Sequence, residues 1–133
     1  MIEKPVEWEL LSKRALSVKN NAHLIDELKG TSVGAALIAN NGEIFTGCNV
    51  EHQYRISDVH AEVNAITNMI TAGHKSFYAI LVVAERKRFT PCGSCLDWII
   101  QFGGLQCLIG YQTGRNSNII VHTAHELMPY YPE

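Results

Sequence analysis

Short apolar runs separated by polar turns divide the chain into candidate strands. The runs that are typical of strands cover residues 33–39, 43–49, 78–84, 105–111 and 118–123. The run over 78–84 is apolar throughout, so it predicts a strand at the centre of a sheet. Asn40, Asn41 and Gly42 separate the first two runs, and Asn-Gly is typical of a tight hairpin turn.

Helical spacing of apolar residues alternates with these strands. It covers 6–19, resumes from Asp58 to about 73, and returns from Thr90 to 104, with a short terminal turn of helix over 125–129. Thr90 and Pro91 suit the N-cap and the first helical position. The order of elements predicts an α/β fold, a three-layer α/β/α sandwich over a five-stranded mixed sheet.

Length and composition narrow the class of protein. The chain has 133 residues and neither a repeat nor a linker, so we expect 1–133 to form a single domain. Hydrophobic residues make up 47% and the formal charge is −2, which favours a globular chain and gives no basic excess for nucleic acid. No apolar stretch approaches ~20 residues, so no membrane partner is expected.

The number of cysteines and the N-terminal segment indicate the cellular compartment. The N-terminal segment lacks a basic start followed by an apolar run, so no secretory signal is expected. Four cysteines are too few for a disulfide scaffold, and Cys48 and Cys107 fall in predicted strands as small buried groups. We therefore expect a cytoplasmic protein whose remaining pair, Cys92 and Cys95, serves metal binding or catalysis.

Three residues form a candidate zinc site. Cys92 and Cys95 lie three positions apart in a predicted first helical turn, which lets both sulfurs face one point. The positive end of the helix dipole favours their thiolate form. His60 is a natural third ligand, and three protein ligands leave a fourth tetrahedral position open, as in catalytic zinc sites.

Glu62 is the candidate catalytic residue. It stands two positions after His60, where both side chains can border one cavity beyond the helix end. Zinc lowers the pKa of water to roughly 7, and a glutamate beside it can take up and redeliver the proton. Hydrolytic removal of an amino group from a ring carbon needs both actions.

The combination of H-x-E with P-C-x-x-C is the signature of zinc deaminases. From about Val33 to Pro129 the chain resembles the cytidine deaminase family, through VGAALIA, the hairpin that follows, Asn49-Val50-Glu51, PCGSC and the E-L-M-P tail. The resemblance implies Zn²⁺, a nucleoside substrate, a role in pyrimidine salvage, and a homotetramer or a dimer.

The same resemblance implies substrate contacts. Asn49 and Glu51 would bond sugar hydroxyls, and the backbone of Ala61 would contact the base. After the tail, Tyr130 or Tyr131 would reach a neighbouring subunit's pocket. Phe89 stands beside the predicted metal ligands and is a candidate for lining the pocket.

Several positions depart from the family's pattern. His60 replaces the cysteine usual in enzymes of this length, and Val63 follows Glu62 where an arginine is expected shortly afterwards. These two changes are mutually consistent, because a neutral ligand removes the negative charge that an arginine would offset. Changes at 29–32 and 96–97 affect the expected substrate rather than the reaction.

Deamination of a cytidine-like nucleoside is the hypothesis we favour, and alternative hypotheses stay open. A deaminase of blasticidin S or another cytosine-nucleoside analogue is one, and a deoxycytidylate deaminase is another, since H-A-E-x-N-A-I also occurs there. A catalytically silent zinc or nucleoside-binding protein, a structural zinc site and a redox dithiol remain further readings. The basic triplet 86–88 is expected to be a solvated loop, with contact to an anion as the other possibility.

Overall fold

The computed structural model describes residues 4–87 and 89–132, and five strands in it form one sheet. The strands are β1 (Val33–Ala39), β2 (Ile44–Cys48), β3 (Phe77–Ala84), β4 (Leu108–Gln112) and β5 (Ile120–Thr123). Their order across the sheet is β2-β1-β3-β4-β5. Only β3 and β4 pair in parallel among them, so the predicted mixed sheet is confirmed, with β3 at its centre.

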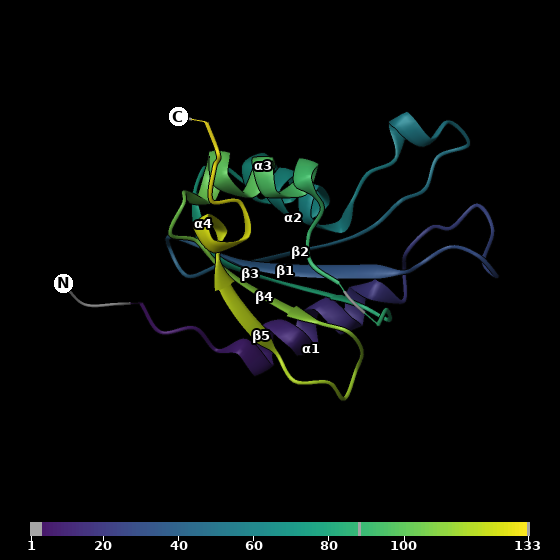
Figure 1. Cartoon of the computed structure of the whole chain (residues 1–133), viewed down its shortest axis with the longest axis horizontal. Coiled ribbons are helices and arrows are strands. Elements are labelled where there is room, and N and C mark those ends of the chain that lie inside the picture. The colour runs from purple at the N-terminus through teal and green to yellow at the C-terminus, as the bar shows by residue number, and fades with distance from the viewer. Residues whose placement is uncertain (1–3, 88, 133) are drawn as a thin grey trace.

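Helices cover both faces of the sheet (Figure 1). The helices are α1 (Trp8–Lys19), α2 (Ala61–Thr71), α3 (Gly93–Gly103) and α4 (Ala124–Leu127), with a 3-10 turn at Arg55–Ser57. Helix α1 lies alone on one face, and α2, α3 and α4 lie on the other. The predicted three-layer α/β/α sandwich is therefore confirmed.

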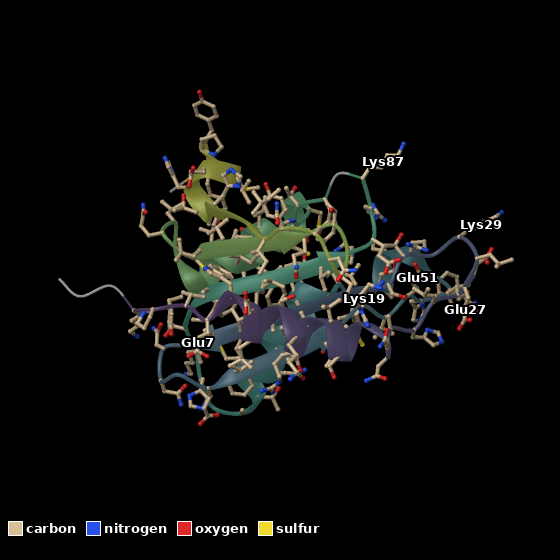
Figure 2. The ribbon with its side chains drawn as sticks, turned by 90° about the horizontal axis from the view of Figure 1, so that it is seen from below. Glu7, Lys19, Glu27, Lys29, Glu51 and Lys87 are labelled. Atoms are coloured by element: carbon tan, nitrogen blue, oxygen red, sulfur yellow. The ribbon has the colours of Figure 1, made fainter. Side chains whose placement is uncertain are left out.

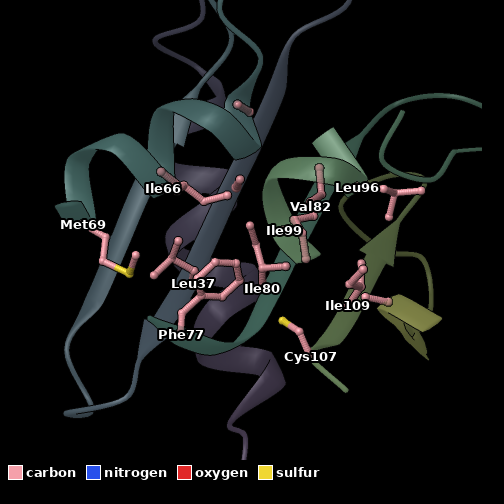
Figure 3. Close-up of a cluster of buried hydrophobic side chains, with 14 of the residues drawn as sticks. Leu37, Ile66, Met69, Phe77, Ile80, Val82, Leu96, Ile99, Cys107 and Ile109 are labelled. Carbon is pink, nitrogen blue, oxygen red and sulfur yellow. The ribbon is translucent and has the colours of Figure 1, made fainter. Parts of the chain in front are cut away.

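Each face of the sheet has its own hydrophobic core. Alternate β1 residues point to opposite sides: Leu37 packs with α2 and α3, while Ala36 packs with α1. Figure 3 shows the larger core, where Ile66 of α2 and Ile99 of α3 converge on Ile80 of the central strand. These three side chains are fully buried, so both helices are held firmly against the sheet.

Several predicted boundaries are wrong by two or three residues, among them the starts of α2, α3 and β4. Helix α2 begins at Ala61 rather than Asp58, because Val59 pairs with Val50 and His60 is extended as the N-cap. Helix α3 begins at Gly93 rather than Pro91, because Cys92, with an extended backbone, is its N-cap instead of Thr90. Strand β4 begins at 108 rather than 105, because a turn bonds the Cys107 amide to the Gly104 carbonyl.

Helix α2 lies unusually close to β2. A Cβ atom placed on Gly47 would come within 2.5 Å of the Ala65 nitrogen and 2.7 Å of the Ala61 oxygen. Two side-chain amides reinforce this approach, with Asn64 donating to the Cys48 carbonyl at 2.9 Å and Asn68 to the Thr46 carbonyl at 2.8 Å. The position of α2, and with it that of His60, is therefore fixed by the β2 backbone.

Membrane-spanning helices are absent from the described parts of the chain, since none of the helices there is both long and apolar enough to cross a bilayer.

Candidate active site

The N-terminal ends of α2 and α3 bring three metal-binding side chains together. The Nδ1 atom of His60 lies 3.2 Å from Cys95 Sγ and 3.4 Å from Cys92 Sγ. All three donor atoms lie within 4.8 Å of one another. A tetrahedral zinc ion separates its nitrogen and sulfur ligands by roughly 3.6 Å, so the donor set and its spacing fit zinc.

Helix capping explains why the two cysteines converge. Cys92 is the N-cap of α3, and its Sγ accepts a hydrogen bond from the Cys95 amide at 3.4 Å. Cys95 is buried in the first turn, whereas Cys92 and His60 are exposed at the helix ends. Burial raises the pKa of the Cys95 thiol in the metal-free protein, and a bound cation favours the thiolate instead.

Glu62 is buried beside these donors and is only 4% exposed. Desolvation raises the pKa of its carboxyl, while a backbone hydrogen bond, His60 and Cys95 partly oppose the rise. The described residues hold no lysine or arginine paired with Glu62. A carboxyl in this setting can exchange a proton with a molecule bound in front of the metal-binding residues.

A cavity of about 440 Å³ opens in front of this cluster. His60, Cys92 and Glu62 border it, and so do four of the predicted substrate-contact residues, which are Asn49, Glu51, Ala61 and Phe89. The volume falls within the range of small-molecule sites. The structure thus brings Glu62, these four substrate-contact candidates, and His60 and Cys92 of the metal-binding cluster to one cavity.

Asn49 and Glu51 both hold the cavity walls together. The Asn49 side chain accepts from the Val33 amide and donates to the Thr31 carbonyl, each at 2.8 Å. Glu51 accepts from the Ile25 amide at 2.9 Å. Each side chain therefore fixes a neighbouring loop as well as facing the cavity.

The two C-terminal tyrosines lie away from the cavity of their own chain. The Tyr131 hydroxyl donates to Asp97 on α3 at 2.6 Å, and Tyr130 is 95% exposed. The prediction that one of them reaches a neighbouring subunit stays a prediction.

Sequence reasoning missed part of the cavity rim. Thr31, Arg55 and Arg86 line the cavity. Arg86 is also exposed, so its place at the cavity is compatible with the expected solvated loop. Lys87 is exposed, and Arg88 lies outside the described residues. The signal was the basic triplet placed just before Pro91-Cys92, where a loop leaving β3 must pass the metal-binding cluster.

Two cysteine ligands, one histidine and a nearby glutamate that is not a ligand are typical of zinc-dependent deaminases. The family model described as "Cytidine and deoxycytidylate deaminase zinc-binding region" matches residues 6–111. The chain therefore belongs to the cytidine and deoxycytidylate deaminase family, which confirms the resemblance that its motifs indicate. The zinc-binding description of that family and the His60, Cys92 and Cys95 cluster together identify Zn²⁺ as the fitting cofactor.

Individual relatives agree with this assignment. A protein of Dictyostelium discoideum described as "Probable cytidine deaminase" is 36% identical over 99 residues, which span 73% of this chain and 65% of the relative, slightly under two thirds. A cytidine deaminase of Halalkalibacterium halodurans is 33% identical over 93% of this chain and 92% of its own. The crystal structure of cytidine deaminase from Burkholderia pseudomallei matches with a TM-score of 0.83 and 29% identity, covering 94% of this chain and 98% of that chain.

Proposed function

We propose that this chain, as one domain over 1–133, is a zinc-dependent hydrolase that deaminates a cytidine-like nucleoside and releases ammonia. The observation that carries the proposal is Glu62, a buried carboxyl at the same cavity as a His-Cys-Cys donor set. A structural zinc site or a nucleoside-binding protein needs no such carboxyl. The similarity to proteins named cytidine deaminase supports the same substrate class.

Each residue has a distinct part in the proposed reaction. His60, Cys92 and Cys95 hold the zinc ion. Bound zinc lowers the pKa of water and so supplies a nucleophile at neutral pH. Glu62 would take one proton from the attacking water and pass it to the ring nitrogen, and would then carry the second proton, from the hydroxyl added to the ring carbon, to the departing amine. Atoms balance, because one water enters, the exocyclic amino group leaves as ammonia, and a ring carbonyl replaces it.

Substrate contacts complete the proposal. We assign Asn49 and Glu51 to the sugar, the Ala61 backbone to the base and Phe89 to the cavity wall. The position of all four residues at the cavity supports these roles. A homo-oligomer, with a tetramer favoured over a dimer, is part of the same proposal. The almost fully exposed Tyr130 supports it, since that ring is free to enter a neighbouring subunit's cavity.

A cytoplasmic location is also proposed. The cysteines within the described residues are all free, and two of them are the proposed zinc ligands. A reducing compartment keeps such thiols available for metal.

The deciding experiment is ammonia release by the zinc-loaded protein from cytidine, deoxycytidine, deoxycytidylate, blasticidin S and adenosine. We expect release from a cytosine nucleoside or its derivative and none from adenosine. Glu62→Gln should lower turnover by about 10²–10⁴-fold and keep its zinc, because it removes only the proton carrier.

Glu27→Gln is the matched control, since Glu27 is exposed on a loop and does not line the cavity. It should retain both turnover and zinc. Full activity of Glu62→Gln would show that the proton carrier is misassigned. Bound zinc with no ammonia from any compound would favour the silent binding protein.

A further inference from the structure

Arg86 is a cationic side chain at the cavity whose charge is not neutralised by an ion pair. It follows the end of β3 and lines the cavity with its neighbours Phe89 and Thr90. Its Nη2 atom donates to the Thr31 hydroxyl at 3.2 Å. Among the described residues, no carboxylate lies within 4 Å of its guanidinium.

The other arginine at the cavity differs in this respect. Arg55 lies 3.6 Å from Glu51 through Nη1 and 2.9 Å from Asp58 through Nε. These two carboxylates are also held by backbone amides, Glu51 by Ile25 and Asp58 by His52. The charges of Arg55, Glu51 and Asp58 are thus committed to one another. Of the two arginines among the described residues that line the cavity, Arg86 is the one available to a ligand.

The position of Arg86 indicates which part of a substrate it faces. Thr31 bonds Arg86 through its hydroxyl and Asn49 through its carbonyl, so the three residues share one stretch of cavity wall. Asn49 is the residue proposed to bond the sugar. Arg86 therefore lies at the sugar end of the cavity rather than at the zinc-binding end.

The hydrogen-bond donors of the Arg86 guanidinium indicate which chemical groups it can bind. It carries five N–H donors in a planar fork that matches the oxygens of phosphate and carboxylate. Among the described residues, its one hydrogen bond is to the Thr31 hydroxyl. Charge-assisted hydrogen bonds of this kind are about twice as strong as neutral ones.

We propose that Arg86 is a specificity-determining residue that binds an anionic group, a phosphate or a carboxylate, carried on the sugar of the nucleoside substrate. This inference rests on the proposed function for the identity of the nucleoside. It does not depend on turnover, because binding alone reveals it.

The test measures equilibrium binding to the zinc-loaded Glu62→Gln protein, in which the ligands are not consumed. The ligands are deoxycytidine, deoxycytidylate and a cytidine whose 5′ carbon is a carboxylate. We expect at least one anionic ligand to bind about tenfold or more tightly than deoxycytidine, as a charge-assisted pair predicts. The two anionic ligands show whether the site prefers phosphate or carboxylate.

When Arg86→Gln is added to the Glu62→Gln protein, the anionic ligand and deoxycytidine should bind with affinities that differ by no more than about twofold. The substitution removes the charge and keeps a polar side chain. Lys87→Gln is the matched control, since Lys87 is the next residue, is exposed and is not among the described residues that line the cavity. Figure 2 shows it extending outward from the loop. The Lys87→Gln variant should preserve the ratio of the two affinities. Rising salt should lower the ratio in the protein that keeps Arg86, because Arg86 is exposed and salt screens exposed charges.

Three results would overturn the inference. One is equal affinity for neutral and anionic ligands. Another is an equal loss of the ratio in the Arg86 and Lys87 variants, which would assign the effect to the general charge of the loop. The third is no binding of either anionic ligand. Selective binding without ammonia release by the unmodified protein would instead refute the proposed function while leaving the role of Arg86 intact.

Discussion

The floor and the rim of the cavity are built in different ways. The floor, His60, Glu62, Cys92 and Cys95, consists of residues at the ends of helices that pack on the sheet. The rim belongs to loops, where side chains such as Glu51 reach across to hold neighbouring segments. The geometry of the proposed reaction therefore depends on helix packing, whereas the preference for a substrate depends on a few side-chain hydrogen bonds.

The largest expected effect comes from removing a donor at the floor. Cys92→Ser replaces a soft sulfur ligand by a hydroxyl that binds zinc poorly, and it also changes the N-cap of α3. We expect zinc affinity to fall by more than about 100-fold, with a lower melting temperature, because metal binding stabilises the folded state. Competition with a chelator followed by elemental analysis measures the first effect, and calorimetry the second.

Cys48→Ala is the control for that experiment. Cys48 ends β2 and is outside the donor cluster, so the variant should keep its zinc. Equal zinc loss in both variants would mean that the metal is bound elsewhere.

A smaller effect is expected where the floor depends on packing alone. Gly47→Ala adds a methyl group within 2.5 Å of the α2 backbone, and backbone atoms can give way only if the helix moves. Such overpacking costs about 1–3 kcal/mol. Because His60 caps α2, we also expect weaker zinc binding without any change in the donor residues.

Urea denaturation and the same chelator competition measure the two consequences of Gly47→Ala. Gly114→Ala is the matched control, since nothing lies within 4 Å of its added methyl group. Unchanged stability and zinc affinity in Gly47→Ala would show that α2 can shift without cost, and would remove the distinction between a rigid floor and an adjustable rim.

The sequence predicted the floor well because its signals are local. H-x-E and P-C-x-x-C have a fixed spacing, and each opens a helix whose apolar positions recur at helical spacing. The boundary errors at 58–60 and 90–92 came from the same residues, because His60 and Cys92 adopt the extended backbone of an N-cap, which apolar spacing does not reveal.

The resemblance named Asn49, Glu51 and Phe89, which line the cavity. The contacts within the rim were not predicted, because they are long-range. Thr31 and Arg86 are 55 positions apart, and Glu51 binds the Ile25 amide 26 positions away. Neither pairing follows from propensity or periodicity, since each depends on where two loops meet after the sheet has formed. The expectation of a solvated loop over 86–88 therefore does not reveal that the exposed Arg86 also lines the cavity.

The smallest effect is expected at Glu51, where one substitution should loosen the rim and leave the floor in place. Glu51 is 8% exposed, and its carboxylate accepts from the Ile25 amide and faces Arg55. Figure 2 shows it beside the loop that carries Glu27 and Lys29. Glu51→Gln keeps the shape of the side chain and removes its charge, so the hydrogen bond to Ile25 weakens by about 1 kcal/mol.

Hydrogen exchange of the Ile25 amide measures the strength of this hydrogen bond, and we expect the exchange to become about fivefold faster in Glu51→Gln. Zinc affinity should stay unchanged, because Glu51 is not among the metal-binding residues. Glu27→Gln, in the same loop but exposed, should alter neither quantity. A parallel fall in zinc affinity in Glu51→Gln would mean that the rim supports the floor, so that substrate preference and metal binding could not change independently in this protein.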